Sequence, residues 1–165
     1  MARVNKSKKL RPSILDRLLD DDPENLVETE PDQHHRLREL RASVQRDMET
    51  LMNTRLRLVE PDEKYSELKT SLLNYGLPDL ATVNLSDKKN KTAFIDSLET
   101  LLIEFEPRFK SVNVQYLENN EALDRTVRFR IEATLYADPM PEVVVFDSVL
   151  EPVSRSVNIE EAGYG

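Results

Sequence analysis

Two acidic residues near the middle of the chain are the first candidates for chemistry, because a pair of carboxylates can hydrolyse a glycosidic bond by acid–base catalysis. Glu104 and Glu106 are two residues apart at the predicted end of a helix, so their side chains point in different directions. Pro107 and Arg108 follow, and a neighbouring guanidinium keeps a carboxylate ionised, whereas an acid catalyst needs a raised pKa. We therefore predict no catalytic residue and no enzyme.

Other sites of chemistry are equally poorly supported. His34 and His35 are adjacent, so on a helix they point about 100° apart and cannot hold one metal ion from the same face. The chain has three glycines and no cysteine, which leaves no phosphate-binding loop, no thiolate chemistry and no disulfide. The sequence predicts no cofactor, no metal and no small-molecule substrate.

The segment Glu106-Pro107-Arg108 falls where one periodicity gives way to another. Apolar residues from Phe94 to Phe105 recur at helical spacing, and Val112, Val114 and Tyr116 then alternate with polar residues as in a strand. Pro107 ends the helix, since it has no N–H and restricts the residue before it. At this helix–sheet corner the guanidinium of Arg108 can fork onto a carboxylate or onto backbone carbonyls. Arg108 is then either a local staple or the organiser of a subunit contact, and both interpretations stay open.

The rest of the chain divides into helices followed by strands. Helices are predicted at about 33–53 and from Ser86 or Asp87 to Phe105, with a shorter helical piece between Tyr65 and Leu72 that stops at Gly76. Strands are predicted at 112–117, 126–136, 143–150 and 153–159. The third is nearly all apolar and is expected to be covered on both faces, and the fourth is expected to be an edge strand that can accept another chain's strand.

This order of elements predicts an α+β fold of two layers, with amino-terminal helices packed on a mostly antiparallel carboxyl-terminal sheet. We expect one domain at 33–159, a flexible arm at 1–32 and a loose tail at 160–165. Within the arm, Ser13 could cap about two helical turns. Four apolar residues would line one side of this short helix: Ile14, Leu15, Leu18 and Leu19. Since so short a helix is unstable alone, they must pack on this domain or dock on a partner.

Charge and composition limit the partners. The net charge is −8, and residues 13–32 hold eight acids against Arg17 alone, which argues against nucleic acid as the main ligand. No apolar run approaches the ~20 residues of a membrane span, and the basic amino terminus lacks the apolar region of a secretory signal. A cytosolic location without membrane insertion is expected.

Several segments of the chain, taken in collinear order, form a recognisable set: Arg11 to Leu18, Ser43 to Arg55, Asn74 to Asp79, Phe105 to Arg108, Arg128 to Ala133 and Pro141 to Asp147. Together they resemble one family, TssE, the baseplate subunit of the bacterial type VI secretion system. TssE is similar to the wedge protein of contractile phage tails that was once labelled lysozyme-like. Met48 and Met52 depart from the family, which more often has leucine there.

The resemblance implies a non-enzymatic assembly role, with the family's Glu-Pro-Arg motif at Glu106, Pro107 and Arg108. It implies baseplate partners TssF, TssG and TssK, initiation of the sheath proteins TssB and TssC by strand exchange, and a place in the cytoplasm at the inner face of the envelope. Two alternatives remain: a regulatory anti-adaptor that shares the fold, and a peptidoglycan hydrolase, suggested by the older label alone.

Overall fold

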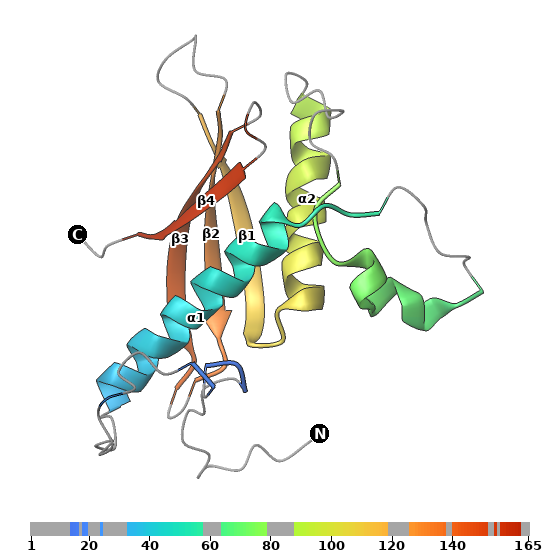
Figure 1. The fold of residues 1–165 in the computed structure, drawn as a ribbon. Helices are drawn as coiled ribbons and strands as arrows, with labels where there is room; N and C mark the ends of the chain where they lie inside the picture. Colours follow the sequence, from blue (N-terminus) through green and yellow to red (C-terminus); the bar gives the residue numbers. More distant parts are fainter. Residues whose placement is uncertain are drawn as a thin grey trace.

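Two helices pack on one face of a four-stranded sheet in the computed structural model of this chain (Figure 1). The structure describes residues 14–16, 18–19, 24, 33–57, 64–78, 88–118, 126–137, 140–151, 154 and 156–162. The helices are α1 (Gln33–Asn53) and α2 (Lys88–Phe105). Both predicted long helices are confirmed, although the proposed caps of α2, Ser86 and Asp87, lie outside the described residues.

The sheet is an antiparallel meander in the order β1-β2-β3-β4. Its strands are β1 (Phe109–Leu117), β2 (Val127–Leu135), β3 (Glu142–Glu151) and β4 (Ser156–Glu161). The predicted two-layer α+β class, with helices before the sheet, is confirmed. β1 starts earlier than predicted, directly after the Pro107 corner. The pairing of β1 with β2 shifts in register between Phe109 and Ser111, as at a β-bulge.

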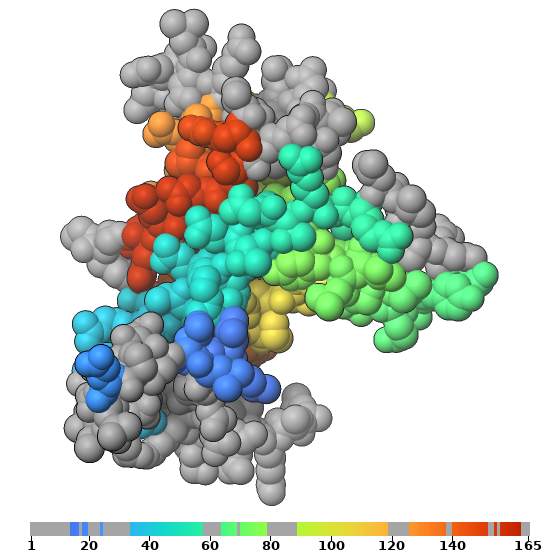
Figure 2. All heavy atoms as spheres, in the orientation of Figure 1, coloured from blue at the N-terminus to red at the C-terminus, as the bar shows by residue number. Residues whose placement is uncertain are grey.

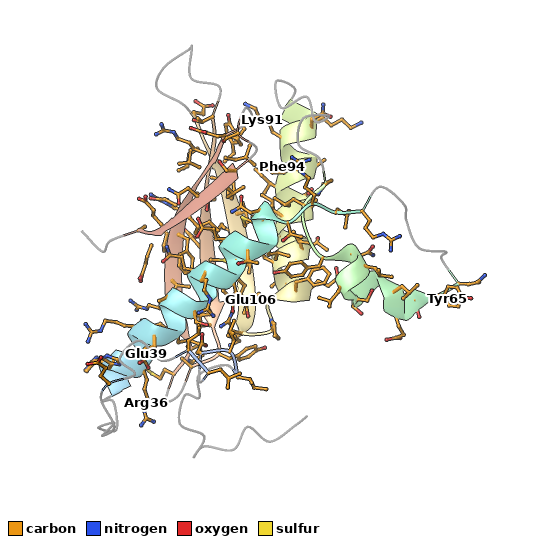
Figure 3. All side chains as sticks on the ribbon, in the orientation of Figure 1. Arg36, Glu39, Tyr65, Lys91, Phe94 and Glu106 are labelled. Carbon is orange, nitrogen blue, oxygen red and sulfur yellow. The ribbon has the colours of Figure 1, made fainter. Side chains whose placement is uncertain are left out.

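The core lies between the helices and the inner face of the sheet. In β2 every second residue from Val127 to Leu135 is buried, as the period of two requires. Phe94 of α2, labelled in Figure 3, projects from the helix toward the sheet. Its ring meets that of Phe129 edge to face, with centroids 6.5 Å apart. α1 adds Val44, Met48, Leu51 and Met52 to the same cluster, and α2 adds Leu98 and Leu102.

The prediction that β3 is covered on both faces is wrong. Val144, Phe146 and Leu150 are buried on the inner face, whereas Val143 on the outer face is 53% exposed. Among the described residues the helices lie on one face only, so the outer valines of β3 are left partly accessible. The apolar run reflects strand preference for β-branched residues rather than a second covering layer.

β4 is an edge strand, as predicted, but its outer edge is occupied. Asn53 of α1 donates its Nδ2–H to the carbonyl of Val157 (2.9 Å) and accepts the N–H of Val157 at its Oδ1 (2.8 Å). Gln45 donates to the carbonyl of Ile159 (2.7 Å). The expectation of an open carboxyl-terminal edge is therefore wrong, because side chains of α1 take the place of a neighbouring strand. β4 also includes Glu160 and Glu161, which the sequence assigned to the tail.

The segment between the helices forms two short 3₁₀ turns, Ser66–Thr70 and Leu72–Asn74, rather than the predicted α-helical piece. Gly76 follows with φ +119°, as expected for a glycine after a helical end. The chain then runs beside Arg55, with the N–H of Leu77 donating to the carbonyl of Thr54 (2.8 Å). This bridge fixes Tyr75 against the end of α2.

Candidate interaction site

The corner between α2 and β1 brings the three residues of the Glu-Pro-Arg motif together. The last helical bond runs from the N–H of Glu106 to the carbonyl of Leu102 (2.9 Å), and Pro107 cannot continue the ladder. The carbonyl of Arg108 accepts the N–H of Tyr136 (2.9 Å), which ties the corner to the end of β2. Helix end and sheet therefore hold the motif in one fixed conformation.

Glu106 is buried, with 5% of its surface exposed, and its carboxylate is fully engaged by Arg108. Its Oε1 accepts the backbone N–H of Arg108 (3.0 Å) and the Nε–H of the same residue (2.7 Å), and its Oε2 accepts from Nη2. This is the bidentate arrangement in which a guanidinium matches a carboxylate best. The expected fork of Arg108 onto a carboxylate is present in the structure.

Arg108 also reaches across to α1. Its Nη1 donates to the Oγ of Ser43 (2.9 Å) and its Nη2 to the Oδ2 of Asp47 (2.6 Å). Burial opposes the charge of Arg108, but the bonds to Glu106 and Asp47 outweigh it and raise its pKa above the usual value. Arg108 therefore joins α1, the end of α2 and the start of β1, and stays charged.

The ionic network continues from α1 to the amino-terminal segment. Arg46 donates to Asp47 (3.1 and 3.2 Å) and to Asp16 (2.7 Å), and Ser43 donates to the other oxygen of Asp16 (2.8 Å). The bond to Asp16 raises the pKa of Arg46, against the effect of burial and with a further contribution from Asp47. We call the six residues the arginine cluster: Asp16, Ser43, Arg46, Asp47, Glu106 and Arg108.

Four members of this cluster were not among the predicted site residues. Ser43, Arg46 and Asp47 stand at i, i+3 and i+4 on α1, a spacing that places them on one helix face and could have indicated a shared polar partner. Asp16 offered no such signal, because its contacts lie 27 and 30 residues away in the sequence.

An open groove with a volume of about 480 Å³ lies beside the cluster, between α1 and the α2–β1 corner. Tyr75 and Phe105 form one wall and meet edge to face, with centroids 5.5 Å apart. Burial raises the pKa of Tyr75, and the negative charges of Asp47 and Glu106 add to this. Apolar side chains dominate the lining, and three charged residues interrupt it: Leu40, Met48, Leu51, Tyr75, Phe105 and Pro107, with Asp47, Glu106 and Arg108.

The four apolar residues predicted to dock face away from the domain. Ile14 is 79% exposed, Leu15 52%, Leu18 76% and Leu19 54%. The N–H groups of Leu18 and Leu19 both donate to the carbonyl of Leu15 (2.9 and 3.0 Å), which closes one helical turn. We call the described residues of this turn, Ile14, Leu15, Asp16, Leu18 and Leu19, the docking turn. It lies against α1 beside the segment where α2 passes into β1 (Figure 2).

This arrangement suits binding better than catalysis. Glu104 is exposed on α2 while Glu106 is buried at the corner, so the two carboxylates do not face a common space. Within the described part of the chain, no three metal-binding side chains gather around one point. Neither α1 nor α2 is long and apolar enough to cross a membrane. The site instead offers a rigid arginine, an apolar groove and exposed leucines.

Comparison with known protein families gives one match. The model of the family described as baseplate wedge protein gp25, the family of TssE, matches residues 38–140. This range holds α1 from residue 38 onward, α2, β1, β2 and the whole Glu-Pro-Arg motif. It leaves out the docking turn, β3 and β4. No curated protein matches the chain at a significant level.

Proposed function

The chain belongs to the family of baseplate wedge protein gp25, and from that premise we propose that it is a wedge subunit of a type VI secretion baseplate. The family assigns it a structural role in a phage-tail-like baseplate. The finer assignment follows the resemblance to TssE: it binds TssF, TssG and TssK in the bacterial cytoplasm, at the inner face of the envelope, and has no enzymatic activity.

The observation that carries this proposal is the state of Arg108. A motif of the family sits at a corner where a charged arginine is bonded to Glu106, Ser43 and Asp47 and borders an open apolar groove. A preorganised arginine beside an apolar pocket is typical of residues that dominate protein–protein interfaces. The proposal makes this corner the contact with a wedge partner.

We further propose that the protein starts polymerisation of the TssB–TssC sheath by adding a strand to its sheet. At β4, strand addition would break the bonds of Asn53 and Gln45 to Val157 and Ile159. At β1, among the described residues, one side chain bonds the outer edge: Glu99 accepts the N–H of Val114 (2.7 Å). Since, in the described part of the chain, strand addition at β1 displaces one carboxylate rather than two side chains, the proposal puts the sheath strand at β1.

The test separates an interface role of Arg108 from a purely local one. Arg108→Ala leaves the buried carboxylate of Glu106 without its positive partner, which by itself can lower the free energy of unfolding by about 3–5 kcal/mol. The double variant Glu106→Gln/Arg108→Gln removes both charges and leaves neither unpaired. Both variants replace the natural chain in secreting cells that carry a fluorescent sheath protein, and their melting temperatures are measured in vitro.

We expect the double variant to fold with a melting temperature close to that of the natural chain and yet to form no sheaths. Arg130→Gln is the matched control, because Arg130 forks onto Asp147 in the same way on the outer face of the sheet (2.7 and 3.0 Å). It should assemble sheaths normally. Normal sheath assembly by the double variant would show that the Glu-Pro-Arg motif stabilises the corner locally and is not an interface.

Recovery of a proteolysis adaptor or a response regulator with the chain, in place of wedge subunits, would favour the anti-adaptor alternative.

A further inference from the structure

The docking turn is held with its acidic residue toward the domain and its leucines toward solvent. Asp16 accepts from Ser43 (2.8 Å) and Arg46 (2.7 Å), and Leu15 and Leu18 are 52% and 76% exposed. A short amphipathic turn packed on its own domain would bury the leucines and expose the carboxylate. Its orientation here is the reverse, so the apolar side of the turn is left open to solvent.

The docking turn and the groove belong to one surface. Asp47 lines the groove and accepts bonds from both Arg108 and Arg46, and Arg46 holds Asp16. One ionic network therefore fixes the turn at the rim of the groove. A partner segment that filled the groove beside Arg108 could therefore also contact the exposed leucines of the turn.

The charge around this surface indicates what the occupant carries. The arginine cluster contains three carboxylates and two guanidiniums, so it keeps one uncompensated negative charge. The lining of the groove has the same balance, with Asp47 and Glu106 against Arg108. A net negative charge beside an apolar groove fits a partner that carries basic residues beside an apolar stripe.

We propose that Asp16 is a positioning residue that latches the docking turn to α1, so that turn and groove together receive one basic amphipathic helix of a wedge partner. The inference rests on the proposed function and deepens it. Asp16 acts through Arg46, and the apolar stripe of the partner helix contacts both the groove and the outward leucines. Salt should weaken this binding, because screening reduces the attraction between the net negative charge of the arginine cluster and the basic helix.

The experiment measures binding of the full-length chain to purified wedge subunits that are co-expressed as a complex. Asp16→Asn keeps the shape of the side chain and removes its charge. Asp147→Asn is the matched control, because it also removes one carboxylate held by an arginine, Arg130, but on the outer face of the sheet. We expect a Kd about tenfold weaker for Asp16→Asn, since a charge-assisted bond is lost, and no change for Asp147→Asn.

Two further measurements test whether Asp16 acts by holding the docking turn through Arg46. The double variant Asp16→Asn/Arg46→Gln should lose no more affinity than either single variant, because both changes open the same latch. In the free protein, amide exchange at Leu18 and Leu19 should be faster in Asp16→Asn than in the natural chain. Additive losses, or equal exchange in the two proteins, would overturn the latch.

The outcomes distinguish this inference from the function on which it rests. If the natural chain does not bind the wedge subunits, the proposed function fails and the inference fails with it. If it binds and Asp16→Asn matches Asp147→Asn, only the latch is overturned. Binding that is unchanged by salt would contradict a basic partner helix.

Discussion

Arg108 is the residue on which three elements depend. Its guanidinium is shared by Glu106 at the corner and by Ser43 and Asp47 on α1, so it links α1 to the α2–β1 corner. The motif and its Arg–carboxylate fork could be predicted from sequence, because Glu106 and Arg108 are two residues apart. The partners on α1 could not, since 61 and 65 residues separate them from Arg108 and only the fold brings them together.

Gly76 is a second residue on which the site depends. At φ +119° a side chain is strained, and a Cβ there would lie 2.4 Å from the carbonyl oxygen of Thr54. Gly76→Ala should therefore lower the free energy of unfolding by about 2–4 kcal/mol, as strained backbone and overpacking together imply. Denaturant unfolding of the variant beside Leu72→Ala, whose side chain is 86% exposed, checks this. A Gly76→Ala variant as stable as Leu72→Ala would show that the loop adapts.

At the scale of elements, the pairing of α1 with β4 distinguishes this sheet from an open meander. The period of two predicted the four strands correctly, because alternation is a local property. It could not predict that one face of β3 is left partly open, or that α1 covers the edge of β4, since both depend on where the helices lie. Helical spacing likewise could not distinguish the two 3₁₀ turns, Ser66–Thr70 and Leu72–Asn74, from an α-helical piece.

The cover of the β4 edge can be tested with one side chain. Asn53→Ala removes both bonds to Val157 and leaves a backbone N–H and carbonyl without them, which should cost about 1–3 kcal/mol of stability. Amide exchange at Val157 should become faster. Thr50→Ala, which removes only an exposed bond within α1, should change stability by less than about 0.5 kcal/mol. Unchanged exchange at Val157 in Asn53→Ala would mean that α1 does not protect this edge.

Across the whole molecule, the features suited to binding gather on the side of the fold where α1 crosses the α2–β1 corner (Figure 1). The docking turn, the arginine cluster and the groove all meet there, while the outer face of the sheet carries mainly polar residues and the exposed valines of β3. The family match adds the baseplate context, which no residue pattern in the docking turn provides, because the match begins at residue 38.

Recovery of partners from cells tests the central claim, a wedge subunit that binds through this side of the molecule. The full-length chain, a chain lacking residues 1–22 and the Glu106→Gln/Arg108→Gln variant are each purified through a tag from cells with the intact secretion machinery. Mass spectrometry then quantifies TssF, TssG and TssK. We predict that the full chain recovers these subunits, that the truncated chain recovers less, and that the double variant recovers least. Equal recovery with all three chains, or none with the full chain, would contradict the account.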